Sequence, residues 1–216
     1  HKAFIVNGVE KEFFYIGAYE AGYTSGKATS LYGQTVLVSV DFPTMVSRCK
    51  ARNTGGVTGF DLVNIYQIGA IQCLCVVEMG AADSQTIIGS GHSSGSACVA
   101  TGTTNAVWRG IHELWANSWC LTRGLENRSM KYYIWTDAGN ETFVSTGLAV
   151  PTGSNSPIAS VYKNEIFKGL FLPLAVGSGS YSDNFWSANG TMVCYHGGSW
   201  AAGVADWLFC LDLSNP

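Results

Sequence analysis

Only two stretches of this 216-residue chain keep the spacing of apolar residues that an amphipathic α-helix requires. The first begins near Asp41, with Pro43 in its first turn, and the second runs from about Asp61 to Met79. The rest of the chain alternates short strand-like runs with loops rich in glycine, serine and threonine. Two helices among many short strands predict an α+β fold, and we expect a single domain over residues 1–216.

Strand-like runs of β-branched and aromatic residues are expected at 3–6, 13–19, 131–136, 142–145, 170–174, 192–195 and 207–213. The first two runs predict a hairpin with Asn7-Gly8 as the turn signal, and the next two predict a hairpin around the polar segment 137–141. Residues 151–160 are expected to form a loop. Residues 80–107 are weakly apolar and rich in small residues, which predicts a long loop inserted into the domain.

Charged residues are scarce in this chain. They make up 12% of it, the same share as aromatic residues, while 47% of the residues are apolar, so the chain can bury a large core and is not disordered. The net charge is −3 and no cluster of Lys or Arg is present, which argues against a nucleic-acid-binding surface. No uncharged apolar stretch reaches the roughly 18 residues of a membrane helix, so we expect no membrane insertion.

The residues that carry most chemistry are scattered. Seven cysteines stand at irregular spacing and no two histidines have metal-ligand spacing, so we expect neither a catalytic metal site nor a cofactor. Buried free thiols in a reducing cytosol are the favoured interpretation, with a Cys194–Cys210 disulfide as the alternative. Asp137, Glu141 and Asp183 could surround a Ca²⁺ ion, although they lack regular carboxylate spacing. The loop Gly89–Gly95 lacks the lysine of a phosphate-binding loop.

The ends of the chain allow one expectation. Residues 1–6 show no signal-peptide pattern and no initiator methionine is present, so we expect the end piece of a longer protein or a trimmed chain.

Two tryptophan-containing segments, Arg109–Trp119 and His196–Gly203, carry a resemblance to a known family. The first resembles a signature of the C-type-lectin-like fold, which formylglycine-generating-enzyme-type domains share with phage tail receptor-binding proteins. The second is similar to the ending of variable proteins diversified by retroelements, typified by phage tropism determinants. The opening residues 3–19 also resemble the phage branch.

The resemblance implies a C-type-lectin-like fold with two helices, short antiparallel strands and long loops. On a helical turn, Trp115 and Trp119 would share one face toward the core. Gly197-Gly198 would permit a close backbone approach, and Trp200 would fold under that turn as a buried anchor.

In the variable proteins, side chains of the last strands and loops contact the ligand. Their mixed Tyr, Ser, Asn, Asp and Gly composition suits an adaptable binding surface, although residues 177–190 could also be an ordinary polar connection. Carried over by position, the implied ligand-binding residues are Tyr181, Asp183, Asn184, Ser187, Ala188, Asn189, Ala201, Ala202, Val204, Ala205 and Asp206.

The function expected from the resemblance is recognition without catalysis. The chain would be the receptor-binding domain of a phage tail fibre, a homotrimer in the virion that is made in the host cytoplasm and binds a bacterial surface protein or glycan. One alternative is an adhesin or lipoprotein on the bacterial cell surface, and another is a structural tail or collar component. A formylglycine-generating-type enzyme is disfavoured, because Cys210 has no neighbouring cysteine and no adjacent arginine.

Overall fold

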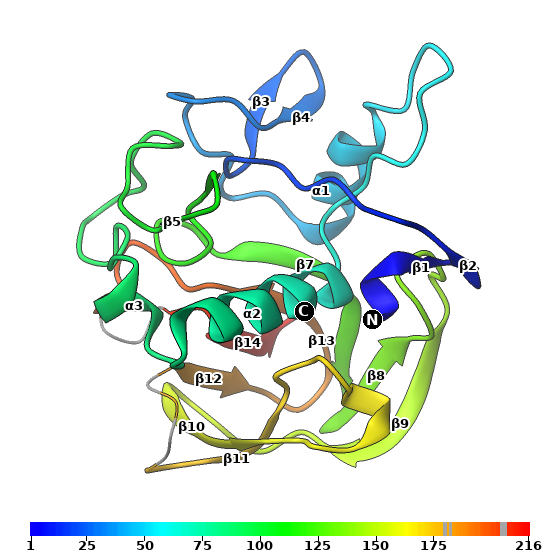
Figure 1. Ribbon diagram of the computed structural model, residues 1–216, viewed down its shortest axis with the longest axis vertical. Helices are drawn as coiled ribbons and strands as arrows, with labels where there is room; N and C mark the ends of the chain where they lie inside the picture. Colours follow the sequence, from blue (N-terminus) through cyan, green and yellow to red (C-terminus); the bar gives the residue numbers. More distant parts are fainter. Residues whose placement is uncertain (179–180, 182, 204–206) are drawn as a thin grey trace.

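A large curled β-sheet and the helix α2 (Ile65–Met79) form the centre of the molecule (Figure 1). The computed structural model describes residues 1–178, 181, 183–203 and 207–216. Within these residues the sheet has eight strands in the order β11-β10-β12-β14-β13-β7-β8-β9. All neighbouring strands are antiparallel except β12 and β14, which are parallel. The predicted α+β class is confirmed.

The strands of the large sheet are β7 (Cys120–Arg128), β8 (Lys131–Trp135), β9 (Phe143–Ala149), β10 (Ser156–Val161), β11 (Pro173–Val176), β12 (Asn184–Ser187), β13 (Thr191–His196) and β14 (Leu211–Asn215). Among the described residues, three two-stranded ribbons lie outside it: β1 (Ile5–Val6) with β2 (Val9–Glu10), β3 (Gly22–Thr24) with β4 (Lys27–Thr29), and β5 (Val107–Trp108) with β6 (Ile111–His112). The 3₁₀ turns that lie wholly within the described residues are η1 (Lys2–Phe4) and η2 (Glu165–Phe167).

Both predicted helices are present, and each begins at a side-chain cap. In α1 (Phe42–Lys50), the Asp41 carboxylate accepts a hydrogen bond from the N–H of Thr44 at 2.7 Å. Helix α2 begins at Ile65 instead of the expected Asp61, because Asn64 and Gln67 form a reciprocal capping box. A third helix, α3 (Ser84–Ile87), lies in the segment that was expected to be loop.

The core lies between α2 and the sheet. Tyr66 of α2 is almost completely buried and its hydroxyl donates to the carbonyl of Trp135 in β8. The apolar residues packed with it include Ile134 of the same strand, Leu125 of β7 and Phe185 of β12. A second apolar cluster continues toward the other end of α2 around Ile71, Cys75, Trp108, Trp115, Leu208 and Phe209. The described residues include no helix with the length and apolarity that a bilayer crossing requires.

The hairpin predictions are confirmed in part. The Asn7-Gly8 turn is present with both residues at positive φ, but it connects β1 to β2, and residues 13–19 form no strand. The hairpin of β8 and β9 around residues 137–141 is confirmed. Most of strand β10 lies in the segment 151–160 that was expected to be loop, and strands β7 and β12 were not predicted.

The C-terminal strand is shorter than predicted, because β14 begins at Leu211 instead of residue 207. The described segment before it is bound by buried polar side chains. The carbonyl of Leu208 accepts hydrogen bonds from Gln72 at 2.8 Å and His196 at 2.7 Å, and the N–H of Phe209 donates to Asp183 at 2.7 Å. Burial lowers the pKa of His196 to about 4, so the ring is neutral and serves as a structural donor.

Candidate binding surface

The tryptophan-rich segment 113–119 is hydrogen-bonded to two loop regions, residues 89–105 and 197–203, which together form the candidate surface. It is an irregular turn and not a helix, because Glu113, Ala116 and Asn117 all have positive φ. Trp115 is 1% exposed and its indole N–H donates to the carbonyl of Gly89 at 2.9 Å. The expectation that tryptophans share a helical face is therefore wrong, although Trp115 is a core anchor.

Trp119 and Trp200 are less buried than expected. Trp119 is half-buried and meets Trp186 of β12 edge to face, with ring centroids 5.5 Å apart. Trp200 is also half-buried, so it is not the buried anchor that the sequence predicted. The fully buried indole of this region belongs to Trp115.

The Gly197-Gly198 turn permits a close approach of two backbones, as expected. Both glycines have φ near +90°, at 91° and 86°. A Cβ atom on Gly197 would stand 3.1 Å from the carbonyl oxygen of Leu114. The N–H of Ala116 donates to the carbonyl of Gly197 at 2.8 Å, and so fastens the turn to segment 113–119.

Asn117 is the hydrogen-bonding centre of the region. It is completely buried, its backbone N–H donates to the carbonyl of His92 at 2.9 Å, and its carbonyl accepts from the N–H of Trp200 at 3.1 Å. Its side chain accepts from the N–H of Val99 at 2.9 Å and donates to the buried carboxyl of Glu20. Four separate chain segments are thus held by one side chain and its peptide groups.

Two buried carboxyl groups, of Glu20 and Glu113, extend the hydrogen-bonded network around Asn117; we call this network the buried frame. Glu113 accepts hydrogen bonds from the N–H of Gly102 and the hydroxyl of Thr104, and Glu20 accepts from Asn117 and from the N–H of Ser118. Burial raises the pKa of Glu20 to about 8, an effect that the Asn117 hydrogen bond reduces and the nearby Glu113 increases. Glu20 is therefore protonated at neutral pH.

The predicted residues after the Gly-Gly turn lie at the surface next to this frame. Ala201 is exposed and Ala202 is partly exposed. The N–H of Ala202 donates to the carbonyl of Ser199 at 3.3 Å, and the N–H of Gly203 donates to the carbonyl of Ser93 at 2.8 Å. The predicted residues Val204, Ala205 and Asp206 lie outside the described residues.

The predicted residues before the Gly-Gly turn are bound to other parts of the fold. Asn184 of β12 donates to Asn155, Ser187 donates to the carbonyl of Pro151, and both are only partly exposed. Ala188 is also partly exposed, and Asn189 in the turn after β12 is exposed.

Tyr181 and Asp183 pack inward. The Tyr181 ring is partly buried and meets the Phe209 ring edge to face at 5.5 Å. Asp183 is completely buried, and burial raises its pKa to about 8 even though the N–H of Phe209 donates to it. Its side chain is therefore not part of the described surface, and it fastens the C-terminal segment instead.

A polar hollow beside the 199–203 turn was not predicted. It has a volume of about 340 Å³ and is lined by Gly91, His92, Val99, Thr103, Thr104 and Asn105. One signal in the sequence could have identified it, because residues 84–108 contain no charged side chain and many hydroxyl groups. Such a stretch can line a pocket with polar groups that carry no charge.

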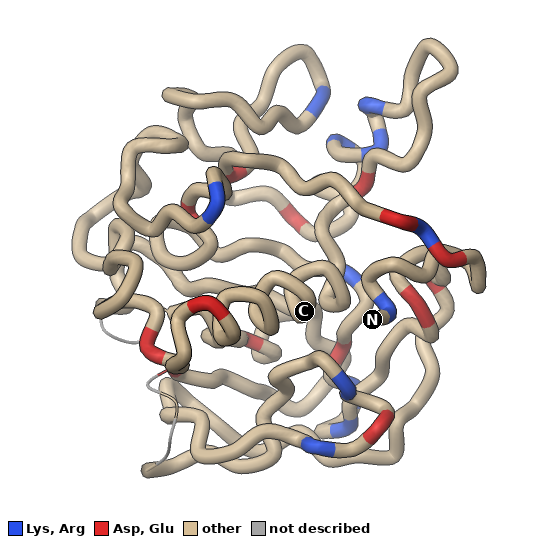
Figure 2. The backbone as a smooth tube through the Cα atoms, viewed as in Figure 1, with Lys and Arg blue, Asp and Glu red and all other residues tan. Residues whose placement is uncertain are grey.

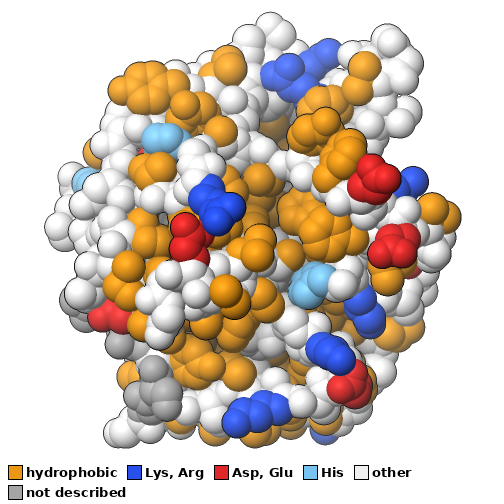
Figure 3. Space-filling view, viewed as in Figure 1, with side chains coloured by type: hydrophobic (Ala, Val, Ile, Leu, Met, Phe, Trp, Pro, Cys, Tyr) orange, Lys and Arg blue, Asp and Glu red, His pale blue; other side chains and the backbone are white. Residues whose placement is uncertain are grey.

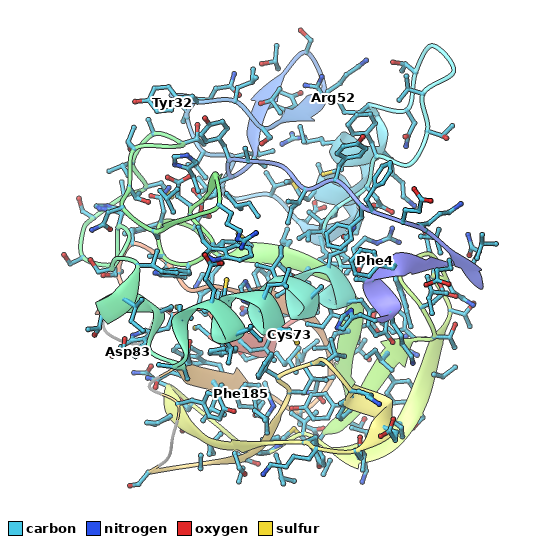
Figure 4. All side chains as sticks on the ribbon, in the orientation of Figure 1. Phe4, Tyr32, Arg52, Cys73, Asp83 and Phe185 are labelled. Atoms are coloured by element: carbon cyan, nitrogen blue, oxygen red, sulfur yellow. The ribbon has the colours of Figure 1, made fainter. Side chains whose placement is uncertain are left out.

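A second surface, over α2, is apolar. Hydrophobic side chains gather over α2 in the middle of the face in Figure 3, and Leu74 and Val77 of this helix are exposed. A groove of about 370 Å³ adjoins them, lined by Cys73 together with residues of segment 161–171. Cys73, which is labelled in Figure 4, belongs to α2.

The acidic residues considered for calcium have other partners. Asp137 accepts hydrogen bonds from four backbone N–H groups of residues 7, 8, 139 and 140, while Glu141 forms ion pairs with Arg123 and Lys50. The part of the chain that the structure describes contains no group of three or more potential metal ligands. Cys194 has a free, buried thiol, so a Cys194–Cys210 disulfide is not formed.

No known protein-family model matches this chain, and no curated protein is similar enough in sequence to match it.

Proposed function

We propose that this chain is a recognition domain without catalytic activity, the receptor-binding domain of a phage tail fibre with a C-type-lectin-like fold. It binds a bacterial surface protein or glycan. The resemblance of segments 109–119 and 196–203 to variable proteins of that kind motivates the proposal, and the two segments contact each other through the Ala116–Gly197 hydrogen bond.

One observation carries the proposal: the exposed Ala201 lies on a turn whose backbone is fixed from both sides. The N–H of Trp200 donates to buried Asn117, and the N–H of Gly203 donates to Ser93. Since these bonds involve peptide groups, the side chain at position 201 can change without loss of the turn. A rigid backbone that carries replaceable side chains suits a binding surface that adapts to different receptors.

The chemistry of the surface agrees with binding more than with catalysis. The buried carboxyl groups of Glu20, Glu113 and Asp183 each accept a hydrogen bond from a backbone N–H, of Ser118, Gly102 and Phe209 respectively. Single contacts between such a surface and a receptor are weak, and display of three copies in a homotrimer would strengthen binding through avidity.

The test is binding to bacteria. The biotinylated chain, assembled on fluorescent streptavidin, is mixed with a panel of bacterial strains and measured by flow cytometry. We expect saturable binding to a subset of strains and a loss of at least about tenfold, or 1.4 kcal/mol, for Ala201→Arg. The matched control is Ala149→Arg at an exposed position at the end of β9, which should bind as the unchanged chain does.

Two results would contradict the proposal. One is the absence of binding to every strain, and the other is equal binding by Ala201→Arg and the unchanged chain. Thermal unfolding of each variant shows whether its fold is intact.

A further inference from the structure

The polar hollow at residues 91–105 adjoins the proposed receptor surface. The hydrogen bond from Gly203 to Ser93 joins its rim to the 199–203 turn. Gly91 forms part of its wall with φ of 65°, and a Cβ atom there would stand 2.9 Å from the Cβ of Ala116. The wall is therefore packed directly on the buried frame, which preorganises the hollow for a ligand.

The hollow is uncharged. None of its lining residues is Lys, Arg, Asp or Glu, and the whole stretch 84–108 lacks these residues. In Figure 2 the basic and acidic segments are few and scattered over the molecule. Because a charged ligand needs a compensating charge when it loses water, the lining favours a neutral ligand.

The polar groups of the hollow are partly used and partly open. His92 Nε2 lies 3.0 Å from the carbonyl oxygen of Ala97, so this nitrogen is the donor and Nδ1 is the second polar atom of the ring. Asn105 Oδ1 accepts from the N–H of Gly91 at 2.8 Å, which leaves its amide nitrogen as a donor. The hydroxyl of Thr103 donates to Ala100 at 2.6 Å and keeps its acceptor lone pairs.

Hydroxyl groups are the natural complement of this set. The hollow offers an amide donor close to several acceptors, and a hydroxyl group both donates and accepts. A ligand with several adjacent hydroxyls can therefore satisfy the lining groups together, which a purely apolar side chain cannot do.

An exposed aromatic ring contacts the residue next to the lining of the hollow. Tyr32 is 65% exposed, and a Cβ atom on Gly102 would lie 2.5 Å from its ring. Its loop is fixed by the hydrogen bond from the N–H of Gly33 to the carbonyl of Thr101, at 2.7 Å. The ring therefore packs on Gly102, the residue that precedes Thr103 of the lining in the chain, and Figure 4 shows Tyr32 at the edge of the molecule. An aromatic face next to hydroxyl-binding groups provides an apolar platform for C–H groups.

We propose that this hollow binds a neutral saccharide unit, with the Tyr32 ring against its C–H face and His92, Thr103 and Asn105 bonded to its hydroxyls. The inference rests on the proposed function, and it deepens that function by assigning the bacterial receptor to the neutral glycans.

The experiment uses an array of neutral and anionic oligosaccharides, including sialylated and sulfated ones, probed with the streptavidin-assembled chain. We expect binding to a subset of the neutral glycans, and competition by the free sugar. Tyr32→Ala should reduce binding at least tenfold, whereas Tyr32→Phe, which keeps the ring, should retain it. Asn105→Asp keeps the oxygen that accepts from Gly91 but removes the amide donor, and should also reduce binding at least tenfold.

Tyr15→Ala is the matched control, because Tyr15 is 86% exposed and belongs to a different segment. Neutral-glycan binding that survives both Tyr32→Ala and Asn105→Asp would overturn the saccharide site, as would binding to anionic glycans alone.

The same variants tested on bacteria separate the two proposals. If bacteria bind the chain but no neutral glycan does, and Tyr32→Ala binds the bacteria unchanged, the saccharide site is wrong and the receptor-binding function stands. If neither bacteria nor glycans bind, both proposals fail.

Discussion

The side-chain amide of Asn117 donates to the carboxyl group of Glu20, which lies 97 residues earlier in the chain. Both residues are buried, at 0% and 8% exposure. The bond fastens the N-terminal segment to the turn that supports the candidate surface. The stability of this surface therefore depends on the protonation state of an internal carboxyl group.

Glu20→Gln should make stability less dependent on pH. The pKa of Glu20 is raised from an ordinary 4.5 to about 8, so the folded chain keeps a proton that the unfolded chain loses as the pH rises above 4.5. Unfolding free energy thus falls between pH 4.5 and 8, by at most about 1.4 kcal/mol per pH unit for each such group. Urea unfolding at several pH values should give a shallower slope for the variant.

The window from pH 6.5 to 8 gives the clearest comparison. Asp183 also has a pKa raised to about 8, so part of the slope remains in Glu20→Gln. His196, with its pKa lowered to about 4, acts in the opposite direction only below pH 6.5. Glu12→Gln, at an exposed position, is the control and should keep the original slope. Identical slopes for Glu20→Gln and the unchanged chain would contradict the assignment.

Asn117→Ala should be among the most destabilising single changes in the chain. It removes the acceptor of the Val99 N–H and the donor to Glu20, and it places alanine at a φ of 59°. The loss of buried hydrogen bonds and the strained backbone together predict a cost of about 3 kcal/mol. Chemical unfolding measures it, with exposed Asn189→Ala as a control expected within about 0.5 kcal/mol of the unchanged chain. A cost below that of the control would exclude the proposed central role.

Local signals in the sequence were sufficient for the caps and turns. Asp41 with Pro43 marks the start of α1, and Asn7-Gly8 marks the first turn, because capping and tight turns depend on neighbouring residues. The expected start of α2 lies four residues too early, because the helix begins only after the reciprocal capping box of Asn64 and Gln67.

Long-range burial was not predictable in the same way. Strand β7 contains Asn127, which is completely buried because its amide donates to the carbonyls of Ala188 and Leu213, both distant in sequence. A buried polar residue interrupts the alternation of apolar and polar residues by which a strand is predicted. Asp183 was expected at the surface for the same reason, since its partner Phe209 lies 26 residues later.

Gly69→Ala should destabilise the chain although alanine favours helices. In the interior of an ordinary helix the change stabilises by about 1 kcal/mol. Here a Cβ atom would stand 2.5 Å from the carbonyl oxygen of Gly169 and 2.6 Å from a methyl carbon of Leu170. The helix would have to move from segment 169–170, so we expect a net loss of about 1–3 kcal/mol in thermal or urea unfolding.

Val77→Ala is the control for this change. Val77 is in the same helix and 83% exposed, so its replacement should leave stability unchanged or slightly increased. A stabilised Gly69→Ala variant would show that α2 does not pack against segment 169–170 as described.

Arg123→Lys tests whether a planar guanidinium is needed to join three parts of the fold. Arg123 of β7 forms ion pairs with Asp61 and Glu141 and lies over the Trp135 ring, 4.6 Å from its centroid. A lysine is a point charge that cannot hold both carboxylates and stack on the ring. We expect a loss of about 1–2 kcal/mol at neutral pH, measured by chemical unfolding. Arg109→Lys, in an exposed pair with Glu78, should cost less than about 0.5 kcal/mol.

The acid side of the same experiment identifies the carboxylate involved. The Arg123 hydrogen bond, aided by Lys50, lowers the pKa of Glu141 from 4.5 to about 2. Its stabilising contribution is therefore complete above pH 4.5 and is lost as the pH falls through about 2, although solvent screening of the exposed Glu141 reduces its size. The stability difference between Arg123→Lys and the unchanged chain should shrink across this range. A difference that stays constant from pH 5 to pH 2 would mean that Arg123 acts through its stacking on Trp135 and not through its charge.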